Sequence, residues 1–220
     1  MIPILPPRTK LFVLLKFGRE DHMRALFHEG VVYMNTVKFF RDSDTKAGRG
    51  DPNEGMPWLK NYPPGEFRVP WAKDKTFHFQ ALQVRAQPKL ALGNIYSLFS
   101  FASHHSIGLD EFRVDPLNKE FGTHMVMIRN PAAFLRRWEE AMRWKQIHHE
   151  RGFVNYYDPS THTGSLNVFW KSSAFAHQQE YRLHAMTAST EPLVVRLGPL
   201  NDIAEVYPSN AVDELVMRPK

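Results

Sequence analysis

Near its C-terminal end the chain contains the stretch Gln178-Gln179-Glu180-Tyr181-Arg182-Leu183-His184-Ala185. Polar and apolar residues alternate along it, which predicts a β-strand, because successive side chains of a strand point to opposite faces. One face would carry the polar residues Gln178, Glu180, Arg182 and His184. The other face would carry Tyr181, Leu183 and Ala185 and pack into a core. Two interpretations of the polar face stay open: it is solvated, as in most half-buried strands, or it lines a nucleotide-processing cleft.

The segments around this strand predict one α+β domain over residues 1–220, with its core from residue 8 onward. Strands are expected at 11–17, 31–36, 77–86, 94–101, 122–129, 152–157, 166–170, 179–187, 193–197 and 203–207. Helical segments are expected at 20–28, 37–40 and 130–146. The last is the clearest, because Asn130 can cap it and Pro131 suits its first turn. We predict a split, mostly antiparallel sheet with flanking helices.

Residues 43–75 interrupt this pattern, because they contain most of the glycine and proline residues in this half of the chain. Irregular segments of such length are uncommon in compact domains and are often functional. We therefore predict a long irregular loop, partly mobile, over or beside the cleft.

The composition excludes several classes of site. The 220 residues include no cysteine, which rules out disulfides, zinc–thiolate sites and a thiol nucleophile. The net charge of +5 favours acidic partners such as nucleic acid or a nucleotide. No stretch approaches the roughly 20 apolar residues of a membrane span, and the apolar run before Lys16 has no cleavage site after it. We expect a cytoplasmic protein that does not contact a membrane.

The acidic residues and histidines do not form a recognisable metal site. Asp42, Asp44, Asp51 and Glu54 resemble a calcium loop, but Ala47 stands where such a loop requires glycine. The two histidine pairs, at 104–105 and 148–149, are adjacent and so lack the spacing of a zinc-binding helix. We predict that the protein holds no metal.

The remaining polar residues form a set spread over the whole chain. Its members are Lys16, Arg41, Arg49, Asp51, Glu54, Tyr96, Ser97, Ser100, Lys171, Gln178, Glu180 and Arg182. Lys16 follows five apolar residues on the first strand, where a charge needs either solvent or a partner. Tyr96 and Ser100 would share one face of their strand and Ser97 the other, and the sequence leaves open which face lines a cleft.

Several short motifs in this set carry a resemblance to a known family. They are Leu15-Lys16-Phe17-Gly18, Tyr33-Met34-Asn35-Thr36, Phe40-Arg41, Arg49-Gly50-Asp51, Glu54-Gly55 and Gln178-Gln179-Glu180-Tyr181-Arg182. In this order the chain resembles a family of uncharacterised bacterial and phage-associated proteins, over nearly its whole length. That family resembles, more distantly, the ADP-ribosyltransferase superfamily. The superfamily has a late Gln/Glu-x-Glu motif, which Gln178 and Glu180 match. Lys16 stands where arginine or histidine is usual, and Tyr96-Ser97 replaces a Ser-Thr-Ser element.

The resemblance implies an ADP-ribosyltransferase-like fold that uses NAD as a substrate and no metal. Glu180 and Gln178 would be catalytic: Glu180 would stabilise positive charge on the ribose, and Gln178 would orient the acceptor. The residues implied to hold NAD are Lys16, Arg49, Tyr96, Ser97 and Arg182. Arg182 could clamp the pyrophosphate, hold Glu180 ionised, or form a plain surface ion pair. For Lys16 a structural role and a phosphate-neutralising role stay open.

We therefore expect a mono-ADP-ribosyltransferase, an intracellular toxin or phage-conflict effector that modifies protein or nucleic acid. An antitoxin is a further candidate partner. The alternative is a non-catalytic module whose basic surface and aromatic residues bind nucleic acid or protein. A third class, a metal-free hydrolase or nuclease using histidine and glutamate, has less support because no histidine pairs convincingly with a nucleophile.

Overall fold

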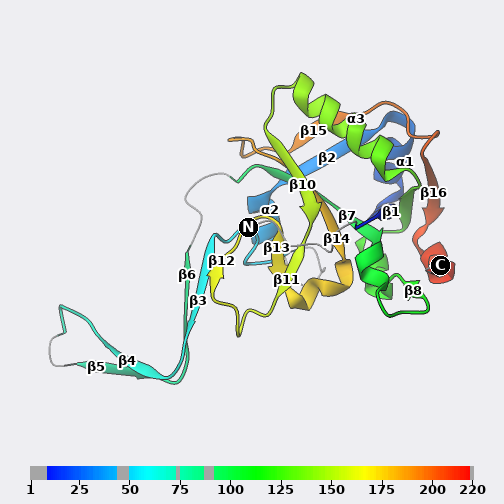
Figure 1. Ribbon diagram of the computed structural model, residues 1–220. Coiled ribbons are helices and arrows are strands. Elements are labelled where there is room, and N and C mark those ends of the chain that lie inside the picture. Colours follow the sequence, from blue (N-terminus) through cyan, green and yellow to red (C-terminus); the bar gives the residue numbers. More distant parts are fainter. Residues whose placement is uncertain (1–8, 44–49, 73–74, 87–91, 219–220) are drawn as a thin grey trace.

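A mainly antiparallel eight-stranded sheet forms the centre of the molecule (Figure 1). The computed structural model describes residues 9–43, 50–72, 75–86 and 92–218. The strands of this sheet are β1 (Leu11–Gly18), β2 (Val31–Thr36), β7 (Asn94–Ala102), β9 (His124–Ile128), β10 (His149–Phe153), β14 (Glu180–Ala185), β15 (Leu193–Arg196) and β16 (Ala204–Pro208). They lie in the order β10-β14-β7-β1-β9-β16, and β2 pairs with both β7 and β15. The predicted α+β class with a mostly antiparallel sheet is confirmed.

The sheet divides along one edge of β7. β1 pairs with this strand between Leu15↔Phe99 and Leu11↔Ala102, whereas β2 pairs with it only at residues 94 and 95. Beyond Leu15, β1 continues beside β9 as far as Gly18. Among the described residues, neither β1 nor β2 pairs with residues 96–98 of β7. The space between the diverging strands is where the candidate site lies.

Helix α3 (Pro131–Trp144) covers one face of the sheet, as its sequence predicts. The Asn130 side chain accepts a hydrogen bond from the Ala133 N–H, and Pro131 occupies the first turn. Its buried residues are Pro131, Ala133, Phe134, Leu135, Trp138 and Met142. All of these except Pro131 share a core with Tyr181, Leu183 and Ala185, so this face of β14 packs inward as expected.

Two shorter helices flank the dividing strands. Helix α1 (Glu20–Glu29) ends at Gly30, whose φ of 66° is in the left-handed region that glycine tolerates best. Helix α2 (Val37–Asp42) begins after Thr36, whose side chain accepts a hydrogen bond from the Phe39 N–H. Both lie close to their predicted positions. None of the described helices is long and apolar enough to cross a membrane.

The other face of β14 is also covered, by small elements that precede this strand in the sequence. They include the parallel pair β11 (Asn155–Tyr157) and β13 (Trp170–Ser172), and the 3-10 helix η4 (Ser173–Gln178). All six residues of β14 are buried. The interpretation of a solvated polar face is therefore wrong. The predicted strand at 166–170 is shifted, because β12 (Gly164–Ser165) and β13 flank most of that range.

The remaining short elements form a second core beside β1 and β9. They are η2 (Ser103–Ser106), β8 (Phe112–Arg113), η3 (Pro116–Phe121), η5 (Ser209–Glu214) and β17 (Val216–Met217). Phe112 and Val212 from this group, with Val114 between β8 and η3, pack on Leu15 and Phe99 of the sheet. Asn118 and Phe121 of η3 lie beside the space where the strands separate.

A long β-ribbon projects from the body (Figure 1). Its base is β3 (Trp58–Tyr62) paired with β6 (Leu82–Ala86), and its outer half is β4 (Gly65–Arg68) paired with β5 (Thr76–Phe79). Pro63 and Pro64 lie between the two halves and have no N–H to offer a ladder. The prediction of an irregular loop over 43–75 is thus wrong for the residues in β3 and β4, and the predicted strand at 77–86 is two strands.

Candidate active site

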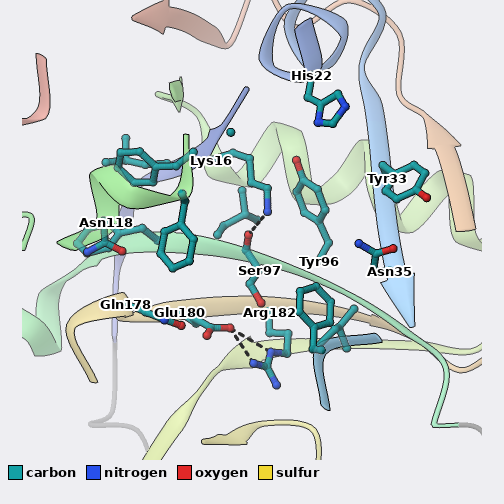
Figure 2. A pocket seen from close by; sticks show the side chains of 18 of the residues that line it. Lys16, His22, Tyr33, Asn35, Tyr96, Ser97, Asn118, Gln178, Glu180 and Arg182 are labelled. Atoms are coloured by element: carbon teal, nitrogen blue, oxygen red, sulfur yellow. Dashed lines mark hydrogen bonds and ion pairs between the residues drawn. The ribbon is translucent and has the colours of Figure 1, made fainter. Parts of the chain in front are cut away.

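A cavity of about 560 Å³ lies where β1 and β2 separate from β7. Its walls include Lys16 and Phe17 of β1, Tyr33 and Asn35 of β2, Ala25 of α1, Phe39 of α2, and Tyr96 and Ser97 of β7. Its base carries Glu54, Lys171, Gln178, Glu180 and Arg182. Figure 2 shows Lys16, Tyr96 and Tyr33 on one side of Ser97, and Gln178, Glu180 and Arg182 on the other. A cavity of this volume is within the range of small-molecule sites.

Glu180 begins β14 and is 4% exposed. Lys171 Nζ lies 2.6 Å from its Oε1, and Arg182 Nη2 lies 2.8 Å from its Oε2. Burial alone would raise the pKa of Glu180, but Arg182 and then Lys171 outweigh it and hold the pKa well below its usual range. A hydrogen bond with the Ser97 side chain acts in the same direction on this pKa. Glu180 is therefore a fixed, ionised carboxylate at the base of the cavity.

Arg182 is shared between two glutamates. Its Nη1 lies 2.6 Å from Glu54 Oε1, its Nε and Nη2 donate to Glu180, and its Nη1 also donates to the Val168 carbonyl. A second bond joins Nη2 to Glu54. A guanidinium has five N–H donors, so these bonds engage all of them. This arrangement favours the role of holding Glu180 ionised over that of clamping a pyrophosphate.

The two carboxylates that share Arg182 are in unequal environments. Burial raises the pKa of Glu54 above its usual value, although Arg182 and Lys171 act against it. Glu180 has the closer contact with Lys171, and its pKa is lowered. Of the two positions, 54 is thus the one at which replacement of the glutamate by a neutral side chain is better tolerated.

Gln178 lines the site, but it is not part of strand β14. It ends η4, and Gln179 takes a left-handed conformation with φ of 39° before β14 begins. The Ser100 N–H and hydroxyl both donate to the Gln179 carbonyl and hold this turn. The expectation that Gln178 lies on the same strand as Glu180 is wrong. Lys171 nevertheless joins them, because its Nζ lies 2.6 Å from both Gln178 Oε1 and Glu180 Oε1.

Lys16 lies on the opposite wall from the glutamates. Its Nζ donates to the Ser97 carbonyl at 2.8 Å and lies 4.2 Å from the centre of the Tyr96 ring. The lysine thus binds β7 at residues 96–98, the part of its edge that pairs with neither β1 nor β2. Burial raises the pKa of Tyr96 far above its usual value, so its hydroxyl stays protonated. Tyr96 and Ser97 are adjacent on β7 and both line the cavity, so the cleft is not lined by a single face of this strand.

All but one of the predicted site residues line this one cavity. They are Lys16, Tyr96, Ser97, Gln178, Glu180 and Arg182. Arg49 lies outside the described residues. Among the described residues there is no group of three histidine, cysteine, aspartate or glutamate side chains placed to hold a metal ion. His22 is the only histidine among the described residues that line the cavity.

Sequence reasoning gave no role to three residues that build the site. Glu54 and Lys171 supply two of its four buried charges, and the Tyr156 hydroxyl accepts a hydrogen bond from the Glu180 N–H at 2.9 Å. A usable signal existed for Glu54, because a glycine follows it in the sequence; in the structure Gly55 has a φ of 68°, and a Cβ there would lie 2.6 Å from a Val37 side-chain atom. Such a turn marks a segment packed closely on the body. Lys171 and Tyr156 gave no comparable signal.

Comparison with protein-family models, with curated proteins and with solved structures gives no match. The functional conclusion therefore depends on the geometry of the cavity and on the motifs of the chain.

Proposed function

We propose that the protein is an NAD-dependent mono-ADP-ribosyltransferase. The observation that carries this proposal is Glu180, a carboxylate fixed and ionised by Lys171 and Arg182 at the base of a cavity with aromatic walls. The motif resemblance points to the same glutamate. The divided antiparallel sheet with a cavity at the division is consistent with an ADP-ribosyltransferase-like fold.

The chemistry explains why a fixed carboxylate matters. In the transfer, the bond between the nicotinamide nitrogen and the ribose C1′ breaks, and neutral nicotinamide leaves with the bonding electrons. The ribose becomes cation-like until an acceptor attacks C1′ and loses its proton. A carboxylate beside the ribose stabilises this cation more than it stabilises NAD, which is the condition for catalysis. Because its pKa is lowered, Glu180 is charged throughout the neutral pH range.

The walls offer suitable groups for the rest of NAD. Tyr33, Phe39 and Tyr96 present aromatic rings, against which a nicotinamide or adenine ring can pack. Lys16 and Arg19 bring positive charge to the same cavity for the pyrophosphate. In this proposal Gln178 keeps its expected part in orienting the acceptor, with its amide oxygen fixed by Lys171.

Incubation of the purified protein with NAD labelled in the adenylate moiety and with cell lysate tests the reaction class. We expect labelled macromolecules together with free nicotinamide. An Ala25→Trp variant should lose both signals, because Ala25 is a half-buried residue of α1 that lines the cavity. Ala132→Trp is the matched control, on an exposed position of α3. Unchanged NAD turnover in Ala25→Trp would place the chemistry outside this cavity.

A further inference from the structure

The outer half of the β-ribbon has one aromatic face. Phe67 and Phe77 are directly opposite each other on β4 and β5, with ring centroids 5.2 Å apart and planes 12° from parallel. Phe79 shares this face, opposite Gly65. The side chains of Phe67 and Phe77 remain 43% and 42% exposed. Trp71, in the turn that joins the two strands, is 85% exposed.

In the part of the ribbon that the structure describes, the contacts with the body are made by its base. The Asn61 side chain of β3 donates to the carbonyls of Pro159 and His162, and β12 pairs with β3. β4 and β5 pair with each other alone among the described strands. A two-stranded ribbon is marginally stable by itself, and a projecting apolar patch commonly marks an interaction surface.

The charge of the ribbon indicates what covers this face. The outer half, residues 63–81, contains three lysine and arginine residues and two acidic ones, and so has an excess of one positive charge. Glu66, the acid on β4, has Arg68 and His78 each at 3.9 Å. Lys75 is exposed directly before β5. A second copy of this ribbon would meet it with the same positive charge, whereas a polyanion would be attracted.

We infer that the outer half of the ribbon binds single-stranded nucleic acid. Exposed rings interleaved with basic side chains suit this ligand, because every base can stack on a ring and the backbone carries one negative charge per nucleotide. In this arrangement bases stack on Phe67, Phe77 and Trp71 and the exposed Lys75 contacts phosphates, while Arg68, on the opposite face of β4, adds to the positive charge of the ribbon. The inference goes beyond the proposed transferase activity and does not depend on it.

Fluorescence anisotropy with labelled 12-nucleotide oligo(dT) and oligo(U), in the absence of NAD, tests the inference. We expect saturable binding of at least one oligonucleotide that weakens as salt concentration rises. Phe67→Ala and Trp71→Ala should each weaken it about tenfold, as loss of one stacking ring typically does. Both side chains are exposed, so circular dichroism should show an unchanged fold. Arg68→Glu combined with Lys75→Glu should weaken binding and reduce its salt dependence.

Trp144→Ala provides the matched control. Trp144 is also 85% exposed, but it ends α3 next to Arg143 and Lys145, the other basic surface with an exposed tryptophan. Its replacement should leave the affinity unchanged. Binding that is lost in Trp144→Ala and kept in the ribbon variants would overturn the inference. It would also be overturned by absence of binding, or by ribbon-dependent dimerisation in sedimentation without oligonucleotide binding.

Discussion

Arg182 and Lys171 determine what Glu180 can do. Two positive and two negative side chains, those of Lys171, Arg182, Glu54 and Glu180, are each at most 4% exposed. Removal of one partner from such a group leaves an uncompensated buried charge, which typically destabilises a protein by about 3–5 kcal/mol. Variants of this cluster therefore have to be compared at equal folded fraction.

Replacement of Lys171 by methionine should change the pH dependence of turnover. Lys171 lowers the pKa of Glu180, so its loss raises that pKa and reduces the ionised fraction in acid. We expect the acid limb of the NAD-turnover profile to move to higher pH, because Arg182 alone then holds the pKa of Glu180 low. Lys171→Arg keeps the charge and should leave the limb near its original position. If the acid limb does not move in Lys171→Met, Lys171 does not lower the pKa of Glu180.

The motif at 178–182 predicted the carboxylate of the candidate site, Glu180, but not the residues that surround it. Glu180 and Arg182 could be paired by alternation because both lie on β14. The left-handed turn at Gln179 could not be predicted, since non-glycine residues seldom adopt it. Nor could the pairing of Arg182 with Glu54, which lies 128 positions away.

Strand β14 separates two different environments, and substitutions on its two faces should have different effects. Leu183 is fully buried against the α3 side of the sheet, so Leu183→Asp places a charge in the core. We expect a loss of about 4 kcal/mol or more in the free energy of unfolding, measured by urea denaturation. The control Val194→Asp, on a β15 residue that is 43% exposed, should stay within about 0.5 kcal/mol. Equal losses in both would contradict the assigned faces.

The outer ribbon should be separable from the rest of the fold. If residues 63–81 are replaced by Asn-Gly, a two-residue turn joins Tyr62 to its partner Leu82 and keeps the base intact. We expect the Tm to stay within about 3 °C of the original and NAD turnover to persist, while oligonucleotide binding is lost. A cooperative loss of the whole fold would show that the ribbon is part of the core.

Most central elements could be predicted from local patterns. The capping signals at Asn130 and Pro131 and the apolar spacing after them place α3 within a few residues. The ribbon could not be found this way, because Pro63 and Pro64 read as loop residues and its strands pair across a turn of mixed composition. Pairing between distant segments supplied the regularity that the local sequence lacks.

The whole molecule should become less stable in mild acid because of buried or half-buried histidines that are neutral in the folded state. Burial, with His104 beside it, lowers the pKa of His105 to about 4. The unfolded chain takes up this proton near pH 6.5, so the stabilisation is complete above that pH and is lost as pH falls toward 4. His104 and His184 also have lowered pKa values and act in the same direction.

Urea midpoints measured between pH 7.5 and 4.5 check this expectation. The midpoint should decrease steadily below pH 6.5, and His105→Asn should reduce the slope. A midpoint that is flat over this range in the original protein would contradict a half-buried His105 that stays neutral in the folded state.

The cavity itself is a property of the whole fold. Its lining comes from β1, α1, β2, α2, β7, β13, β14 and segments between them, which span most of the chain. The resemblance of short motifs predicted most of the polar residues of this lining. The division of the sheet that creates the cavity could not be predicted in this way, because it depends on which residues of β7 each strand pairs with. That pairing is decided by packing between distant segments.

Release of nicotinamide from NAD by the original protein, Glu180→Gln and Glu54→Gln tests the central claim most directly. Both variants remove one negative charge from Arg182, so they form a matched pair, and the raised pKa of Glu54 favours tolerance of the neutral amide there. At equal folded fraction we expect turnover to fall about 100-fold or more in Glu180→Gln and by less than about tenfold in Glu54→Gln. Absence of turnover in the original protein, or equal turnover in the two variants, would contradict the assignment of Glu180 as the catalytic carboxylate.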